Sequence, residues 1–165
     1  MKIDVSSIVK INGASLDVKF DQVLDDLNNF ESGFVFNEAV KFEGVLTNAG
    51  GVLKLNGDLK VSYNVKCGRC VKDIEDNLEL KVREDIIEGG EATDVDAYTY
   101  MDNYILLDNI LKDNIILNLP VKRVCDENCK GLCPRCGTNL NEKTCDCKDD
   151  NINPQMEVLK KFFDN

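Results

Sequence analysis

The feature that most constrains this chain is its distribution of cysteine. The 165 residues include eight cysteines and no histidine, and six of the cysteines lie within residues 125–147. The other two form a C-x2-C pair, Cys67 and Cys70, far upstream. Such a pattern has three common explanations, which are disulfide bonds, redox catalysis and metal binding.

Disulfide bonds are disfavoured by the compartment that the N-terminus indicates. The sequence MKIDVSSIVKINGASLDVKF carries charges throughout and lacks the apolar core of a signal peptide. No stretch of the chain approaches the roughly 18 apolar residues that a membrane-spanning helix needs. We therefore expect a cytoplasmic protein, and thiols stay reduced in the cytoplasm.

Redox catalysis is the stronger rival, because Cys67-Gly-Arg-Cys70 resembles the thioredoxin motif. A redox cysteine normally lies at a helix N-terminus, where the helix dipole stabilises its thiolate. Here CGRC follows one strand-like segment and leads into another, so it is expected at the tip of a hairpin. A thiol-disulfide oxidoreductase that uses Cys67 and Cys70 remains the alternative function.

Metal binding is the preferred explanation, and structural zinc is the expected ion. Four thiolates hold one zinc tetrahedrally, and CGRC and CPRCG are turns in which backbone amides can offset the charge of the sulfurs. Gly137 supplies the backbone freedom that the second turn needs. Without histidine or an obvious carboxylate ligand, a zinc-activated water is not expected, and neither is an enzyme. The candidate metal ligands are Cys67, Cys70, Cys125, Cys129, Cys133, Cys136, Cys145 and Cys147.

Two divisions of these sulfurs remain open. In the first there are two zinc ions, and each has four ligands: Cys133, Cys136, Cys145 and Cys147 for the tail site, and Cys67, Cys70, Cys125 and Cys129 for the other. The second site would then clip the hairpin tip to the segment that follows Pro120. In the other division a single tail site is drawn from Cys129, Cys133, Cys136, Cys145 and Cys147.

The middle of the chain has the pattern of a sheet with one apolar face. Between residues 59 and 65, leucine, valine and tyrosine alternate with polar residues, and residues 78–82 repeat the alternation, as in half-buried strands. Asn56-Gly57, between two apolar segments, is interpreted as a two-residue hairpin turn. We predict an antiparallel meander, with further strands at SLDVKF and FVF and a helical turn at FDQVLDDLNNF.

Two helices and one loop complete the expected architecture. YILLDNILKDNIILNLP has helical spacing and ends at Pro120, which predicts a helix that caps the sheet. NPQMEVLKKFF predicts a final helix, and the acidic residues 84–103 are interpreted as a loop. The fold class is therefore α+β, with an antiparallel barrel-like or open sheet and a cysteine-rich, zinc-binding C-terminal segment that ends in a helix. Residues 1–122 would form the body, and residues 123–165 would form the zinc-binding segment packed on it.

Charge limits the partners. The chain has 20 basic and 30 acidic residues, and this net charge of −10 is the wrong sign for a protein that coats nucleic acid. It suits a basic partner, and the acidic loop could hold a basic protein. A small basic strip could still touch RNA, although any solvent-facing side of a sheet carries such residues. Its candidates are Lys60, Lys66, Arg69, Lys72, Lys81, Arg83, Lys130 and Arg135.

From about Val40 to Phe163 the chain resembles the YceD family, the large ribosomal RNA subunit accumulation proteins. The resemblance is carried by CGRC, YILLDNILKDNIILNLPVK, CDENCKGLCPRCGTNLN and the final NPQMEVLKKFF. It implies a bacterial factor for ribosome biogenesis that acts on the level of large-subunit ribosomal RNA. The implied partners are that RNA, a basic ribosomal protein, or both. We expect no membrane partner and no small-molecule substrate.

The family pattern establishes no catalytic residues. Some members keep the first C-x2-C and the pair after Leu-Pro but lack the CPxCG tail. The resemblance therefore favours the two-site division, with Cys67, Cys70, Cys125 and Cys129 as the older unit.

Overall fold

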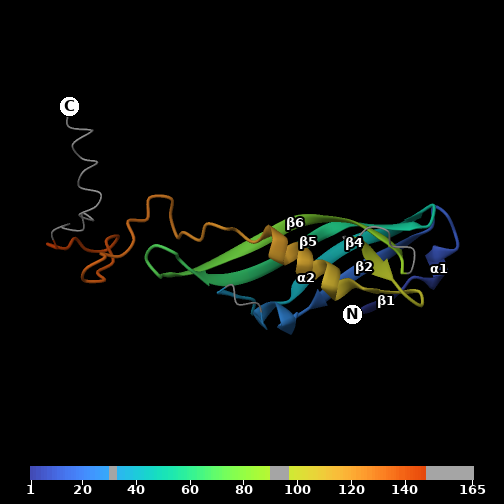
Figure 1. The fold of residues 1–165 in the computed structure, drawn as a ribbon, viewed down its shortest axis with the longest axis horizontal. Helices are drawn as coiled ribbons and strands as arrows, with labels where there is room; N and C mark the ends of the chain where they lie inside the picture. Colours follow the sequence, from blue (N-terminus) through green and yellow to red (C-terminus); the bar gives the residue numbers. More distant parts are fainter. Residues whose placement is uncertain (30–32, 90–96, 148–165) are drawn as a thin grey trace, which may run out of the picture.

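The structure is a computed structural model that describes residues 1–29, 33–89 and 97–147. Its centre is one long, open sheet crossed on one face by a helix (Figure 1). The strands of this sheet are β2 (Ser15–Gln22), β3 (Phe34–Val35), β4 (Val40–Ala49), β5 (Val52–Lys66), β6 (Asp73–Glu88) and β7 (Tyr98–Tyr100). The open sheet, the helix and the cysteine clusters confirm the α+β fold class.

The strand order is β2-β4-β5-β6-β7, and β3 pairs with β5 beyond the end of β4. Neighbouring strands are antiparallel, as predicted, except that β7 runs parallel to the last residues of β6. The sheet is therefore mixed. A parallel neighbour needs a crossover connection, and such a partner has no local sequence signal.

The remaining elements lie at the end of the sheet near the N-terminus or across its inner face. β1 (Lys2–Asp4) pairs with β8 (Tyr104–Leu106), and the short helix α1 (Ser6–Val9) follows β1. A 3-10 helix, η1 (Asp25–Asn29), occupies the predicted FDQVLDDLNNF turn. The capping helix that the spacing of apolar residues predicted is confirmed as α2 (Leu107–Asn118), and Pro120 follows its end.

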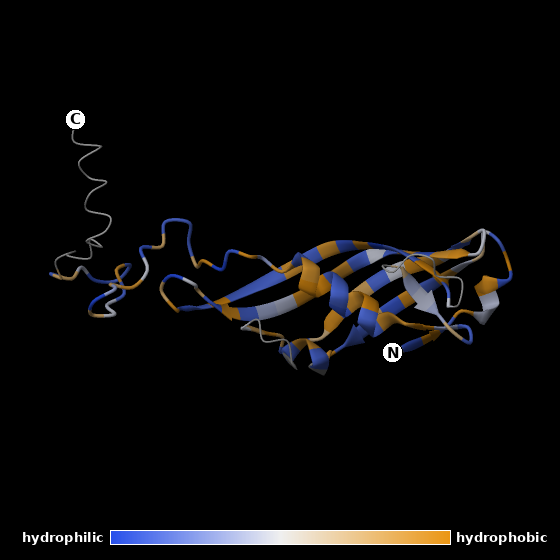
Figure 2. Ribbon diagram, viewed as in Figure 1, coloured by the Kyte–Doolittle hydropathy of each residue, from blue (hydrophilic) through white to orange (hydrophobic). Residues whose placement is uncertain are grey.

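The core lies between α2 and the inner face of the sheet. Leu107, Ile110, Leu111 and Ile115 of α2 are fully buried, as are the inward residues of the long strands, such as Phe42. Apolar and polar residues alternate along these strands (Figure 2). The polar helix residue Asn114 is also inward, and its amide donates to Glu84 Oε1 of β6 at 2.8 Å. This bond anchors the helix to β6.

The prediction of a hairpin turn at Asn56-Gly57 is wrong. β5 runs without a break through both residues, and Gly57 faces Gly44 of β4. The Phe42 ring covers both glycines, because a Cβ atom on Gly57 would lie 2.5 Å from Phe42 Cζ. The glycine at position 57 therefore makes room for an aromatic ring over the strand and does not reverse the chain.

The turn between β4 and β5 lies at Gly50 and Gly51. Both have positive φ, 70° and 98°, and the flanking residues Ala49 and Val52 are paired. Two consecutive residues with positive φ match the twist of a tight hairpin, which is why glycine suits both positions. The Gly-Gly pair was the better turn signal in this segment.

The prediction of a loop over residues 84–103 is also wrong at both ends. Residues 84–88 are the last five of β6, and residues 98–100 form β7. Strand pairing and a buried face at Ile86 outweigh the local acidity, because the acidic side chains of Asp85 and Glu88 point to solvent. Residues 90–96 and the predicted helix at NPQMEVLKKFF lie outside the described residues.

Within residues 1–29, 33–89 and 97–147, no helix is both long and apolar enough to cross a membrane.

Candidate metal centres

The first candidate centre, which we call the tip centre, begins at the hairpin between β5 and β6. CGRC forms this hairpin tip, as predicted, and no helix starts there. The turn is closed by two backbone bonds: the Cys67 amide donates to Lys72 O at 2.8 Å, and the Val71 amide donates to Cys67 O at 3.0 Å. Both cysteine side chains are buried.

Residues 123–129 close against this tip. The Gly68 amide donates to Arg123 O at 2.7 Å, which holds the chain just before Cys125. The Arg69 guanidinium donates to Glu127 O at 3.1 Å and to Cys129 O at 3.0 Å. These bonds bring the second cysteine pair to the first across more than fifty residues of sequence.

Four sulfurs meet there. Cys67 Sγ lies 3.9 Å from Cys129 Sγ, and Cys70 Sγ lies 3.5 Å from Cys125 Sγ. All four are within 4.8 Å of one another. Four sulfurs bound tetrahedrally to one zinc at about 2.3 Å would be about 3.8 Å apart. The group therefore has the size of a single tetrahedral site, and its sulfur separations are far longer than the roughly 2 Å of a disulfide.

Backbone amides converge on the Cys67 sulfur. The amides of Arg69, Cys70 and Cys125 lie 3.4, 3.5 and 3.4 Å from Cys67 Sγ. The Cys70 amide above all, with those of Arg69 and Cys125, lowers the pKa of the Cys67 thiol to about 6, against the opposing effect of burial. One thiolate is therefore favoured near neutral pH, and a metal would displace the protons of the others.

The second candidate centre, which we call the tail centre, repeats the turn of the first. Its sulfurs, also within 4.8 Å of one another, belong to Cys133, Cys136, Cys145 and Cys147. The Cys133 amide donates to Thr138 O at 2.8 Å, and the Gly137 amide donates to Cys133 O at 2.9 Å, as at the tip. The hydrogen bond between Thr138 Oγ1 and Cys136 Sγ, 3.1 Å long, lowers the pKa of Cys136, and the Thr138 amide helps to bring it to about 6.

The two centres differ in exposure. At the tip centre three of the four cysteines are buried and only Cys125 is exposed. At the tail centre only Cys133 is buried, while Cys136 and Cys147 are exposed. A chelator or oxidant in solution therefore has easier access to the tail sulfurs.

Asn141 connects the two centres, and the sequence analysis missed it. Its side-chain nitrogen lies 3.4 Å from Cys129 Sγ of the tip centre, although Asn141 belongs to the loop between Cys136 and Cys145. The Lys130 amide donates to its side-chain oxygen at 2.8 Å. An asparagine in a polar loop carries no sequence signal for this contact, because the partner sulfur is specified only by the folded chain.

The eight sulfurs therefore lie in two groups of four, and each group has the members that the two-site division assigned to it. Cys129 lies with Cys67, so it is separated from the tail set that the single-site alternative drew on. Each group offers four thiols, which leaves no open position on a tetrahedral ion.

The eight candidate RNA contacts are not gathered into an uninterrupted basic strip. On the outer face of the sheet, Lys60, Lys66 and Lys81 form ion pairs with Glu79, Asp73 and Asp58. Arg83 is exposed on the same face of β6, and Lys72 follows the tip turn. Arg69 is engaged with backbone carbonyls at the tip centre, whereas Lys130 and Arg135 are exposed near the two centres.

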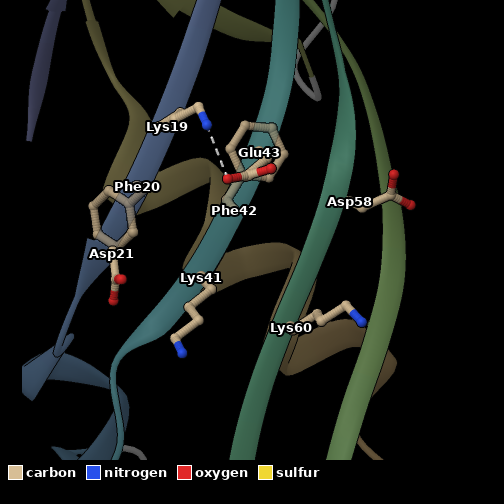
Figure 3. A pocket seen from close by; sticks show the side chains of 8 residues that line it. All are labelled: Lys19, Phe20, Asp21, Lys41, Phe42, Glu43, Asp58 and Lys60. Carbon is tan, nitrogen blue, oxygen red and sulfur yellow. Dashed lines mark hydrogen bonds and ion pairs between the residues drawn. The ribbon is translucent and has the colours of Figure 1, made fainter.

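A shallow hollow on the outer face has the same mixed character (Figure 3). It has a volume of about 340 Å³ and lies over β2, β4 and β5. Lys19, Lys41 and Lys60 alternate there with acidic residues, and Lys19 pairs with Glu43 at 3.1 Å. With positive and negative charges interleaved, the hollow has no single charge with which to attract a phosphate.

Comparison with known proteins gives one family. Residues 55–163 match the family model described as large ribosomal RNA subunit accumulation protein YceD. This range contains both candidate centres.

Three curated relatives illustrate the similarity. A chloroplastic YCED homolog 1 from Zea mays is 29% identical over 151 residues, 72% of this chain and 51% of the relative. The homolog 1 from Arabidopsis thaliana is 26% identical over 126 residues, 58% of this chain and 39% of the relative. An uncharacterized protein from Mycobacterium tuberculosis is 30% identical over 80 residues, 46% of this chain and 39% of the relative.

The chain therefore spans about half or less of the length of these relatives. No solved structure matches it.

Proposed function

Since this chain belongs to the YceD family of large ribosomal RNA subunit accumulation proteins, we propose that it is a non-enzymatic, zinc-stabilised factor in large ribosomal subunit biogenesis. It supports the accumulation or processing of large-subunit ribosomal RNA by binding that RNA, a basic ribosomal protein, or both. Its place of action is the cytoplasm.

The observation that carries the proposal is the closed set of four sulfurs at the tip centre. Cys67 and Cys70 come from the β5–β6 hairpin, and Cys125 and Cys129 come from the segment after α2. Zinc held by four thiolates has no position for water or substrate, so it acts as a brace. In this proposal the brace joins a body, residues 1–122, to a metal-binding segment, residues 123–165.

Charge favours a protein partner over RNA. Each zinc with four thiolates has a net charge of about −2, so two ions would take the formal −10 to about −14. The outer-face lysines already face carboxylates in neighbouring strands. RNA contact would accordingly be confined to exposed cations near the two centres, such as Lys72 and Lys130.

A thiol-disulfide oxidoreductase is not proposed. The Cys67–Cys70 turn lies on a hairpin, where no helix dipole stabilises a thiolate, and both side chains are buried. The amides that lower the pKa of Cys67 serve equally well to offset charge in a metal turn.

The proposal is tested in a strain that lacks the gene. The strain is complemented with the natural chain, with Cys67→Ser, or with Val121→Ser as a control, because the Val121 side chain is 96% exposed. We expect the natural chain and the control to restore the ratio of large- to small-subunit ribosomal RNA, and Cys67→Ser to restore less of it. An unchanged ratio in the deletion strain would rule the proposal out.

Metal content is measured on the same purified proteins. The natural chain is expected to hold two zinc ions and Cys67→Ser one. A natural chain that contains no transition metal would remove the brace from the proposal.

A further inference from the structure

The strand β6 has a long edge that no described strand covers. It pairs with β5 from residue 73 to residue 86, and with β7 only at residues 86–88. Among the described residues, the other side of residues 73–85 therefore meets no strand. At about 3.4 Å per residue this edge is roughly 40 Å long, and it presents unpaired backbone donors and acceptors.

A row of half-exposed apolar side chains follows this edge on the inner face. Val82 and Ile86 of β6 are fully buried near α2, where Glu84 accepts a bond from Asn114. Closer to the hairpin tip, Ile74, Leu78 and Leu80 pack on the core but stay only partly buried. Figure 1 shows the reason, because the β5–β6 hairpin extends beyond the end of α2. The helix leaves this part of the inner face incompletely covered.

The edge is acidic. Residues 73–85 contain six acidic residues and two basic ones. Three of the acids, Asp73, Glu79 and Asp85, are paired with lysines of β5 on the outer face. Glu75 has no ion pair among the described residues, and its side chain is exposed. The two basic residues, Lys81 and Arg83, lie in the half of the edge away from the hairpin tip, so the negative charge that an added strand would meet is concentrated at residues 73–79.

β7 indicates how a strand can occupy this edge. It pairs parallel to β6 at Ile86, Ile87 and Glu88, in line with the uncovered part. A further strand beside residues 74–84 would continue the same row of the sheet. Every second side chain would lie over Ile74, Leu78 and Leu80, with Asp76, which accepts a hydrogen bond from Tyr63 at 3.2 Å, in the same row. The intervening side chains would face the outer side, where Glu75 and Glu79 lie in the half of the edge nearer the hairpin tip.

From this geometry we propose that the edge of β6 at residues 74–84 binds an extended, basic protein segment as an added strand. The segment alternates apolar residues with lysine or arginine. The inference rests on the proposed function only for the source of the segment, which would be a basic protein of the large ribosomal subunit. Recognition comes from backbone bonds and from the acidic edge.

The charge argues against two other occupants. A second copy of the chain would bring an edge with the same excess of six acidic over two basic residues, and two surfaces of like net charge repel each other. An RNA strand would bring phosphates to a negatively charged edge, without the counterion release that favours binding to basic proteins.

The test uses the full, zinc-loaded chain and two synthetic ten-residue peptides. One alternates lysine and valine, and the other has five lysines followed by five valines, so that composition and charge are matched. Amide hydrogen exchange is measured along β6. At a concentration of ten times its dissociation constant, the alternating peptide should slow the exchange of edge amides at residues 74–84 by about tenfold. The block peptide should not.

Three variants test whether the protection arises at the edge of β6. Leu78→Lys adds an inward charge that blocks strand addition and should abolish the protection. Leu117→Lys is the matched control, because Leu117 is 82% exposed on α2, and it should keep the protection. Glu75→Lys, which changes no buried group, should weaken binding and reduce its dependence on salt.

Four results would overturn the inference. These are equal protection by both peptides, protection at the free edge of β2 in place of β6, edge protection that depends on chain concentration without peptide, and protection by a ten-nucleotide RNA. If the alternating peptide fails while ribosomal RNA levels still depend on the gene, only this inference falls. If it binds while those levels do not depend on the gene, the proposed function falls.

Discussion

Val71 and Gly137 occupy the same position in two turns of the same geometry. Each follows the second cysteine of a C-x2-C pair, and each donates its amide to the carbonyl of the first, at 3.0 and 2.9 Å. Both have positive φ, 61° for Val71 and 71° for Gly137. Glycine adopts this conformation without cost, whereas a β-branched residue is strained in it. The tip centre therefore holds a strained residue where the tail centre does not.

Replacing Val71 by glycine should relieve this strain. Strain of this kind reduces stability by on the order of 1–3 kcal/mol. Glycine has more conformational freedom in the unfolded chain, which lowers the gain from relieving the strain by roughly 0.5–1 kcal/mol. The Val71 side chain is 52% exposed, so little apolar burial is lost. We expect Val71→Gly to raise the free energy of unfolding of the zinc-loaded protein by about 1 kcal/mol, as measured by urea denaturation.

The matched change is Gly137→Val, which introduces the strain at the tail centre. It should accelerate the release of one zinc ion without changing the other. A loss of stability in Val71→Gly would show that the valine side chain contributes more through packing than it costs through strain.

The two centres should lose metal at different rates. At the tip centre three cysteines are buried, whereas at the tail centre Cys136 and Cys147 are exposed. A chelator should therefore remove one zinc quickly and the second slowly, as followed by a zinc-sensitive dye. Cys136→Ser should delete the fast phase and Cys67→Ser the slow one. A single phase in the natural chain would contradict the difference in access.

The Gly57 position should not tolerate a methyl group. A Cβ atom there would lie 2.5 Å from Phe42 Cζ and 2.6 Å from Glu43 O. We expect Gly57→Ala to reduce the free energy of unfolding by about 1–3 kcal/mol, the range of overpacked cores. Thermal unfolding measures the loss. Asn56→Ala, at the exposed neighbouring position, is the control and should change little.

A double variant separates the two contacts of that methyl group. If the Phe42 ring is the main obstacle, the double variant Phe42→Leu, Gly57→Ala should lose less free energy of unfolding than the two single variants lose in sum. Strict additivity would show that the contact with the Glu43 carbonyl dominates.

Tyr98 should make stability fall at alkaline pH. Burial raises the pKa of Tyr98 to about 12, and the charges of Asp113 and Glu84 add to the effect. An unfolded tyrosine has a pKa of about 10. The raised pKa contributes stability that is fully present below pH 10 and is lost as the pH rises towards 12.

Tyr98→Phe removes this titration. Its urea midpoint should therefore decline less steeply between pH 9.5 and 11 than that of the natural chain. Tyr104→Phe is the control, because Tyr104 is exposed, and its profile should follow the natural one. Parallel profiles for the natural chain and Tyr98→Phe would contradict the assignment.

Local patterns predicted much of the fold. The alternation at residues 59–65 placed Tyr63 on the buried face, where it is 4% exposed, and the spacing after residue 104 predicted α2. These predictions succeed because side-chain period reports directly on which face of an element is buried. The turn at Asn56-Gly57 failed because a glycine that makes room for a ring has the same local sequence as a glycine that turns the chain.

The sequence by itself determined that the chain has eight thiols and no histidine, and that four of the thiols form two C-x2-C turns. These features decide the kind of metal chemistry that the chain offers. Only the tertiary structure decided that Cys129 lies with Cys67 while Cys133 lies with Cys147, and that Asn141 reaches from one centre to the other. Metal-ligand spacing is a property of neighbouring residues. The sharing of a centre depends instead on backbone bonds, such as that from Gly68 to Arg123, between segments that are distant in the chain.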